Sequence, residues 1–467
     1  MTRIIKTDTM EAAKSTIKQS LVAYTEQVWA VNQKLAMFWD IQGPFLPTTL
    51  NPVFGRNKRA TAKYNRLDSG QAHAFRAPNH QIFNNPELAY KEAGAHDAIV
   101  GVLNTVEGVR VTPHAYGLET SFEAEYGAGG RVLVFNAEYD ALPGIGHACG
   151  HNLIATVGLS SFLAVVDALR ATGAPGRVRL LGTPAEESGG GKIKLIEAGA
   201  YKDVGACLMM HPTAQTAFGP ASVYGNAFDR TLAIARFSIG FKGKPAHAAL
   251  APWEGVNALD AAVAGYTAIS VLRQQIRPQE RIHGIITNGG KQSNIIPDTA
   301  RLEYGVRAPT LAGALALQKR AVKCFAGAAE STGCTMETQD LGGYADLRTN
   351  MPICNAFVEA MGALGREVLC DTDHTTPAST DQGNVSYECP SWHGMFGIPS
   401  EGGAFPHTEN FARGAGLRKS FDRALENSEG MATVGYWFLV DDELAADVKA
   451  AFEEQKKHDG ACIAASI

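Results

Sequence analysis

The middle of the chain alternates between short apolar runs and longer segments with helical spacing. Branched apolar residues dominate residues 131–139, 177–185 and 205–212, as is typical of buried strands. Between them, residues 151–172 and 189–201 have the spacing and length of helices. Strand, helix, strand, helix, strand in this order predicts an α/β domain with a largely parallel sheet that helices cover on both faces.

The pattern changes after about residue 228. Residues 230–243 alternate between apolar and polar side chains, which predicts a half-exposed antiparallel strand. The other elements expected in this segment are strands over 283–290, 299–309 and 334–340 and helices over 255–276 and 311–332. Together they predict an α+β domain with a four-stranded antiparallel sheet and two helices, which occupies residues 228–339 and is inserted into the larger domain.

The larger domain is therefore expected in two parts. The first part covers residues 1–227, and the second covers residues 340–467 and closes with helical segments. Within the first part, residues 37–80 are rich in Pro, Asn, Arg and Gly, so we expect a long loop or insertion there. The length of 467 residues agrees with more than one domain, since an ordinary domain has ~100–200 residues.

Composition narrows the class of protein. The chain has 42 Lys and Arg against 47 Asp and Glu, and this net charge of -5 disfavours nucleic acid as a partner. The sequence shows no secretory signal and no apolar run near the ~18 residues of a membrane-spanning helix, so we expect a cytoplasmic protein without a membrane partner. The eight cysteines are dispersed without a C-x-x-C pair, which disfavours a zinc knuckle or a disulfide framework.

Four clusters of potential metal ligands stand out. Three of them follow the three predicted parallel strands, at the edge where open α/β sheets build their sites. Cys, His and Glu are the ligand types that suit Zn²⁺ or a similar divalent ion. The clusters are His147-Ala-Cys149-Gly-His151-Asn152, Glu186-Glu187, His211-Pro212 and, far away in the sequence, His407-Thr-Glu-Asn-Phe411.

Each cluster alone also has an ordinary structural explanation. A lone histidine is more often a core or surface residue than a ligand, and a glutamate pair more often lies on a solvated surface. Three clusters at one sheet edge favour a metal site over these explanations. Two adjacent acids can also divide the work: if Glu187 binds metal, Glu186 points elsewhere and can serve as general base on a metal-activated water.

These residues make the chain resemble a family of zinc amidohydrolases and peptidases that includes aminoacylase, carboxypeptidases acting on acyl-glutamates, and plant indole-acetyl-amino-acid hydrolases. The resemblance covers about residues 84–440. The stretch from Glu138 to Asn152 is similar to the aminoacylase-like-two branch of dipeptidases and to aminobenzoyl-glutamate hydrolases. Other matching stretches are Asn85-Pro-Glu-Leu88, Gly243-Lys-Pro-Ala-His247, Asn294-Ile-Ile-Pro297 and His407-Thr-Glu-Asn-Phe411.

The resemblance implies a metal centre with one or two divalent ions, zinc by expectation, with manganese or cobalt as alternatives. Cys149 would bind or bridge the ions, and Glu186 would be the general base and proton shuttle. Asp140 would orient a ligand or a loop, although a plain turn residue before Leu-Pro is nearly as good an interpretation. The remaining ligands would be His151, Glu187, His211 and His407.

The inserted domain would serve as a lid and as the platform of a homodimer. Its His247 would reach across the dimer and stabilise the oxyanion of the reaction. Asn294 and Arg307 would hold the carboxylate of the substrate. The long segment 37–80 departs from the family pattern; it could cap the substrate pocket or be a surface insertion.

The sequence therefore predicts a metal-dependent hydrolase of small amides, such as N-acyl amino acids, dipeptides or amino-acid conjugates. Two alternatives on the same fold stay open: a non-catalytic protein that binds a small ligand, and a biosynthetic enzyme that forms amides or transfers acyl groups. A dinucleotide-dependent oxidoreductase is disfavoured, because Gly144, Gly146 and Gly150 lack the G-x-G-x-x-G spacing.

Overall fold

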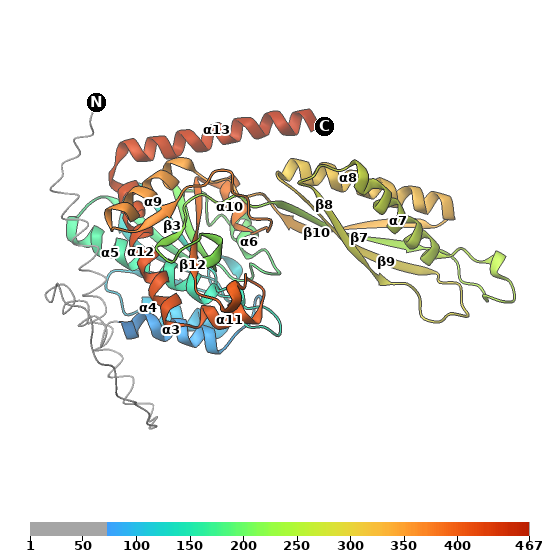
Figure 1. Ribbon diagram of the computed structural model, residues 1–467, viewed down its shortest axis with the longest axis horizontal. Coiled ribbons are helices and arrows are strands. Elements are labelled where there is room, and N and C mark those ends of the chain that lie inside the picture. The colour runs from blue at the N-terminus through green and yellow to red at the C-terminus, as the bar shows by residue number, and fades with distance from the viewer. Residues whose placement is uncertain (1–71, 467) are drawn as a thin grey trace, which may run out of the picture. The chain divides into compact units, whose positions relative to one another are not determined.

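The computed structural model describes residues 72–466, and these form two compact units (Figure 1). The first unit contains residues 72–228, 349–372 and 388–452, and the second contains the rest of the described chain. Most of the predicted loop 37–80 lies outside the described residues.

An eight-stranded sheet forms the centre of the first unit, in the order β1-β2-β4-β3-β5-β12-β6-β11. Its middle strands β4, β3, β5 and β12 run parallel to one another, whereas β1, β2 and β6 make antiparallel pairs. The predicted mixed sheet with a parallel centre is thus confirmed. The strands are β1 (Arg110–Pro113), β2 (Phe122–Ala128), β3 (Val132–Ala137), β4 (Gly176–Gly182), β5 (Ala206–Ala214), β6 (Val223–Asn226), β11 (Glu367–Leu369) and β12 (Ser391–Ile398).

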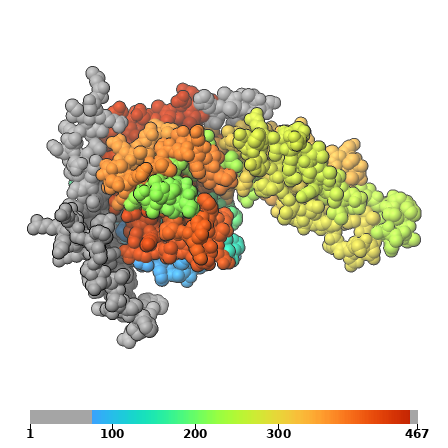
Figure 2. Space-filling model, viewed as in Figure 1, coloured from blue at the N-terminus to red at the C-terminus, as the bar shows by residue number. Residues whose placement is uncertain are grey.

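Helix α5 packs against β3, β4 and β5 and lies along α12, which in turn packs on α9. The core beneath them contains the fully buried Phe135, Phe162 and Trp392. Figure 2 shows how the chain returns on itself: a green segment from its middle lies among orange and red residues from its C-terminal part. Apart from α7 and α8, which belong to the second unit, the described α-helices are α3 (Ala72–Asn84), α4 (Ala93–Leu103), α5 (His151–Thr172), α6 (Gly191–Glu197), α9 (Met351–Ala363), α10 (Gln382–Glu388), α11 (Glu409–Ala415), α12 (Arg418–Val440) and α13 (Asp442–Ser466).

Helix α5 is also long and apolar enough to cross a membrane, contrary to the expectation from the sequence. However, 94% of its apolar window is buried inside the protein, as in the core helix of a globular domain. Its glycine Gly158 explains part of this burial, because a Cβ there would lie 2.9 Å from the backbone oxygen of Asn136. The helix therefore approaches strand β3 as closely as backbone allows.

The second unit contains an antiparallel sheet in the order β10-β7-β9-β8, with helices α7 and α8 on one face (Figure 1). Its core is built around Phe237, Tyr304 and Phe325. Four strands and two helices confirm the predicted α+β domain. They are β7 (Ala233–Lys242), α7 (Ala258–Leu272), β8 (Arg281–Asn288), β9 (Thr299–Ala308), α8 (Leu311–Thr332) and β10 (Thr335–Tyr344). Short 3-10 turns occur in both units: η1 (Ala115–Gly117), η2 (Gln215–Ala217) and η5 (Glu401–Gly403) in the first, and η3 (Pro252–Glu254) and η4 (Arg273–Gln275) in the second.

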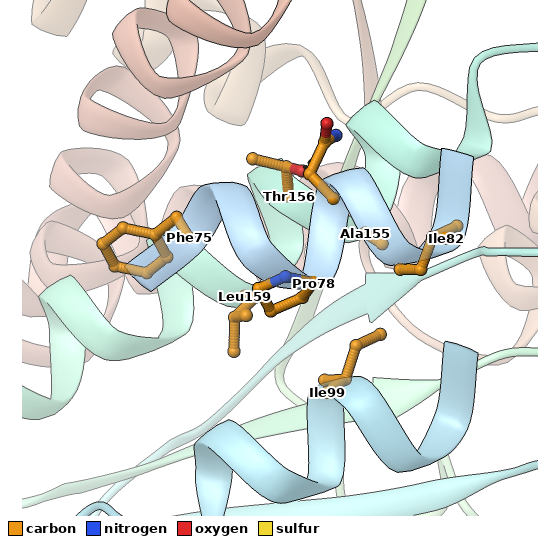
Figure 3. A pocket seen from close by; sticks show the side chains of 8 residues that line it. Phe75, Pro78, Ile82, Ile99, Ala155, Thr156 and Leu159 are labelled. Carbon is orange, nitrogen blue, oxygen red and sulfur yellow. Dashed lines mark hydrogen bonds between the residues drawn. The ribbon is translucent and has the colours of Figure 1, made fainter. Parts of the chain in front are cut away.

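The predicted loop 37–80 is wrong at its C-terminal end, because α3 begins at Ala72. Phe75 and Ile82 of α3 are buried and, with α4 and α5, enclose a cavity of only about 10 Å³ (Figure 3). Asn79 is buried as well, and its amide donates to the backbone oxygen of Asn152 and to Oγ1 of Thr156, both at 2.9 Å. Polar residues that signal a loop in the sequence thus serve as hydrogen-bonded contacts of a packed helix.

We predict that Asn79→Ala destabilises the protein by about 1–3 kcal/mol, because two buried acceptors each lose one hydrogen bond. Urea unfolding measures the loss. Asn84→Ala is the matched control, since Asn84 is exposed at the end of the same helix. Equal stability of the two variants would contradict the packing of α3 against α5.

Candidate metal centre and active site

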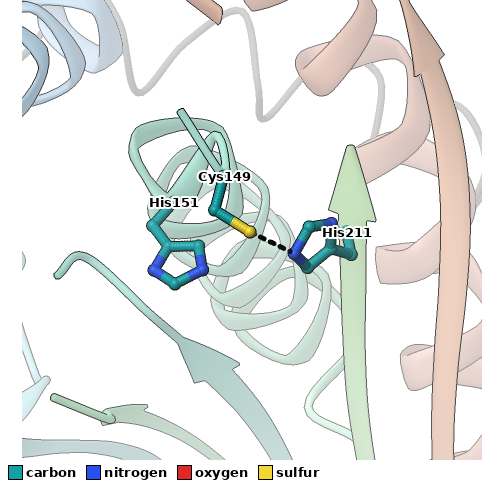
Figure 4. A group of neighbouring side chains, drawn as sticks. All are labelled: Cys149, His151 and His211. Carbon is teal, nitrogen blue, oxygen red and sulfur yellow. Dashed lines mark hydrogen bonds between the residues drawn. The ribbon is translucent and has the colours of Figure 1, made fainter. Parts of the chain in front are cut away.

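Three potential metal ligands meet where β3, α5 and β5 approach one another. Cys149 precedes α5, His151 is its first residue, and His211 lies on β5 (Figure 4). Nε2 of His211 is 3.4 Å from Sγ of Cys149, and the ligand atoms of all three residues lie within 4.8 Å of one another. His211 was expected just after its strand, but β5 continues to Ala214, so the residue lies inside the strand.

Cys149 also belongs to a second group of ligands. Its Sγ, a carboxylate oxygen of Glu187 and a ring nitrogen of His407 lie within 4.8 Å of one another. Nε2 of His407 is 3.3 Å from Oε1 of Glu187. Since one thiol is common to both groups, a single thiolate could bridge two ions.

The two adjacent glutamates belong to different groups. Glu187 lies with Cys149 and His407, whereas the carboxylate of Glu186 lies within 4.8 Å of ligand atoms of His151 and Glu138. Glu186 is 7% exposed. The turn after β4 therefore places the carboxylate of Glu187 beside Cys149 and His407. It places the carboxylate of Glu186 in the neighbouring group.

The backbone adopts unusual conformations to bring these side chains together. Ala185 and His407 have positive φ angles of 60° and 67°, which are strained for residues with a Cβ. The backbone NH of Ala185 donates to Oε1 of the buried Glu92 at 2.9 Å, and that of His407 donates to the oxygen of Ala148 at 2.8 Å. At Gly150 a Cβ would lie 2.6 Å from the ring of Pro212, so only glycine fits between the ligands.

Asp140 holds two of the ligand segments in place. Its Oδ1 lies 3.0 Å from Nδ1 of His151, and its Oδ2 accepts the backbone NH of Glu187 at 3.0 Å. The contact to Nδ1 leaves Nε2 of His151 facing the other ligands.

The protonation states suit metal ligands. Burial lowers the pKa of His211 to about 4, so its imidazole is neutral near pH 7. Burial alone would raise the pKa of Glu187, but His407 and His151 hold it at about 2 and keep the carboxylate charged. Burial raises the pKa of the Cys149 thiol, and a bound cation is what would hold it as a thiolate.

A test of whether these residues fit a divalent ion comes from His151. Its ring is fully buried, and within the described residues its Nε2 makes no hydrogen bond, although Oε1 of Glu187 is only 3.8 Å away. A buried polar atom without a partner is costly, and a cation between nitrogen, sulfur and carboxylate ligands satisfies it. The residues therefore fit a divalent metal ion.

The three remaining predicted residues lie in the second unit. His247 and Asn294 are neighbours: His247 pairs with Ile295 in an isolated bridge, and the NH of Ala248 donates to the oxygen of Asn294 at 3.0 Å. Both side chains are exposed. Arg307 is not brought to them, because Asn294 precedes β9 whereas Arg307 lies near its end.

Sequence reasoning missed several residues of the first unit's site. Glu138 occurs in the matching stretch without a role, but its buried carboxylate contacts Nζ of Lys192 and lies 3.5 Å from His151. Glu92 fixes the turn at Ala185, and the ring of His393 lies 5.8 Å from that of His211. Of these residues, only Glu138 and Lys192 could have been found from the sequence, since they lie beside the Asp140 and Glu186-Glu187 motifs.

A sheet with a parallel centre and possible Cys, His and Glu ligands at its edge, together with a separate antiparallel α+β unit, agrees with the metallopeptidase fold that the sequence predicts. The chain belongs to peptidase family M20/M25/M40, whose family model matches residues 134–422. It is therefore a hydrolase that acts on amide bonds. The family resemblance that was predicted from the sequence is confirmed.

Relatives refine this assignment. The chain is 39% identical over 411 residues to Xaa-Arg dipeptidase of Mus musculus, covering 85% of this chain and 92% of the relative. It is 32% identical over 304 residues to one of the p-aminobenzoyl-glutamate hydrolase subunits of Escherichia coli, covering 61% of each. A solved dinuclear metal-binding peptidase of the M20 family from Bacillus subtilis has the same fold, with a TM-score of 0.57, 22% identity, and coverage of 79% of this chain and 99% of that one.

The shared thiol leads to a prediction about the number of bound ions. Cys149→Ala should lower the occupancy of both ions, whereas His407→Ala should lower the occupancy of one, because His407 belongs to a single group. Elemental analysis after dialysis against zinc counts the ions per chain. His374→Ala serves as control, since His374 lies in the second unit. Equal losses in Cys149→Ala and His407→Ala would contradict the bridging position.

Proposed function

We propose that this chain is a two-metal amidase that cleaves small substrates with a free carboxylate: dipeptides, N-acyl amino acids or amino-acid conjugates. One observation carries the proposal. Two groups of ligands share Cys149, and the carboxylate of Glu186 lies beside them without belonging to either group. This arrangement provides both a place for two ions and a candidate general base.

Cys149 favours zinc among the divalent ions. Thiolates and imidazoles are the ligands that select zinc, whereas sites for manganese contain mostly oxygen. The proposed ligands are Cys149 with His151 and His211 for one ion, and Cys149 with Glu187 and His407 for the other. Bound divalent ions lower the pKa of water and polarise a carbonyl group, which makes amide hydrolysis feasible near neutral pH.

Glu186 supplies the proton transfers of the reaction. Its carboxylate accepts a proton from the attacking water and then donates it to the nitrogen of the leaving amine. The low exposure of Glu186 fits this role, since solvent does not compete for the proton. Asp140 contributes by holding His151 and the backbone of Glu187 in fixed positions.

We assign the binding of the substrate carboxylate to Arg307. Burial, followed by the nearby charge of Arg236, lowers the pKa of its guanidinium group, so two cations lie close together on one face of the sheet. Arg307 donates to Oγ of Ser379 at 2.8 Å, and within the described residues it makes no ion pair. A carboxylate would relieve this repulsion through the paired NH groups of the guanidinium. The name of the mouse relative makes dipeptides the first substrates to test.

A homodimer explains how one substrate meets all the assigned residues. From Thr299 to Arg307, strand β9 spans about 26 Å at ~3.3 Å per residue, which exceeds the length of a dipeptide. Asn294 precedes the end of β9 that lies far from Arg307, so we propose that two copies of the chain contribute these residues to one substrate. We propose that His247 and Asn294 act on the partner's substrate. The open edge of β8, with Ile285 62% exposed, offers an interface for the partner.

We predict that Glu186→Gln lowers kcat by about 100- to 10,000-fold, the usual contribution of a general base, and leaves the zinc content unchanged. A panel of dipeptides, N-acyl amino acids and aminobenzoyl-glutamate measures the activity. Glu197→Gln, at an exposed position of the neighbouring α6, is the matched control. Full activity of Glu186→Gln with a full complement of metal would rule out this mechanism.

A mixing experiment tests whether His247 acts across the dimer. His247→Ala and Glu186→Gln should each be inactive alone. After joint unfolding and refolding in equal amounts, the mixture should recover about a quarter of wild-type activity, because half of the dimers are mixed and each of these has one intact site. A mixture as inactive as its components, or a protein that sediments as a monomer, would contradict the shared site.

A further inference from the structure

A lysine is fully buried beside the metal ligands and has no part in the reaction described above. The side chain of Lys192 is 0% exposed, and its Nζ contacts Oε1 of Glu138, which is 1% exposed. Lysine is rarely buried completely, because removing its charge from water costs several kcal/mol unless it is paired. The burial of the Lys192–Glu138 ion pair beside the possible metal ligands therefore suggests a role for it at this site.

The turn after β4 fixes Lys192 relative to the catalytic acids. At Gly191, a Cβ would lie 1.8 Å from the backbone oxygen of Pro184, so the chain folds back on itself without room for a side chain. The oxygen of Gly189 accepts the hydroxyl of Tyr90 at 2.7 Å and anchors the same turn. One short connection thus delivers the base, a metal ligand and the lysine to the same place.

The other oxygen of Glu138 points at the metal ligands. Oε2 lies 3.5 Å from Nε2 of His151, and neither atom has a hydrogen bond within the described residues. Ligand atoms of Glu138, His151 and Glu186 lie within 4.8 Å of one another, which makes them a third group able to hold a cation. An ion bound there would compete with the first metal position for His151, and it would prevent Glu186 from acting as the base.

We propose that Lys192 is a positioning residue whose ammonium group neutralises Glu138, so that Glu138 binds no metal ion at this third position and His151 and Glu186 stay available to a two-ion centre. The inference rests on the proposed two-metal function. The charges of the three ligand groups support it: once Lys192 neutralises Glu138, the negative charges left in these groups are those of Cys149 as thiolate, Glu186 and Glu187, and Asp140 adjoins them. Their four charges match those of two divalent ions.

The test replaces the ammonium group and counts ions. Met is about as long as the alkyl part of lysine, so Lys192→Met keeps most of the side-chain volume and leaves the charge of Glu138 uncompensated. Metal-free protein is titrated with Co²⁺, the thiolate-to-cobalt absorption is followed, and elemental analysis counts the bound ions. Wild type should bind two ions per chain and Lys192→Met three. The hydrolytic activity of Lys192→Met should fall at least tenfold as metal is added beyond two equivalents, because the third ion occupies Glu186.

A double variant separates this role from a purely structural one. Lys192→Met with Glu138→Gln removes both charges and keeps their shapes, so the double variant should fold, bind two ions and lose its inhibition by excess metal. Lys192→Arg, which keeps a cation, should resemble wild type. Equal ion counts in wild type and Lys192→Met, or a folded double variant that binds fewer than two ions, would overturn the role of Lys192. A wild-type protein that binds no ion would instead contradict the proposed function.

Discussion

Buried negative charge at one edge of the sheet is the constraint on which the rest of the first unit depends. Glu138, Asp140 and Glu186 are less than a tenth exposed, and Glu187 lies in the same cluster. Charges removed from water must be neutralised nearby. Lys192 neutralises one of them, the imidazole of His151 contacts others, and the remainder suits divalent cations. The proposed metal centre would therefore be a consequence of how the fold concentrates acids at this edge.

The fold accepts local strain to build this cluster. Positive φ angles at Ala185 and His407 each cost of the order of 1–3 kcal/mol. The backbone NH of Ala185 donates to the side chain of Glu92, and that of His407 donates to the backbone oxygen of Ala148. The packed helix α5 supplies a rigid base, since its first residue is His151 and nearly all of its surface is buried. Strain at the ligands and close packing beneath them position a thiol, imidazoles and carboxylates from four distant segments within a few ångströms.

The spacing of apolar residues predicted the helices and strands that have a strong local sequence pattern. The bounds of α5 agree with the predicted helix 151–172, and the strands and helices of the second unit follow their predicted order. β12 was missed although every residue in it is buried, because Trp392-His-Gly-Met-Phe396 lacks the branched run of a typical parallel strand. The short strands β6 and β11 and the polar helix α3 were missed for a related reason: they are stabilised by tertiary contacts rather than by local propensity. The motifs pointed to residues that the structure brings together as possible ligands, because these residues are close in the sequence or follow strands of one sheet. The pairing of Lys192 with Glu138 depends on packing and became visible only in the structure.

The central claim is that one thiolate joins two ions at this edge of the sheet. Crystals grown with zinc and measured on both sides of the zinc absorption edge test it most directly through the anomalous difference map. The account predicts two peaks that share Cys149 Sγ, one also bound by His151 and His211 and the other by Glu187 and His407. A single peak, or two peaks of which Cys149 touches neither or only one, would contradict it.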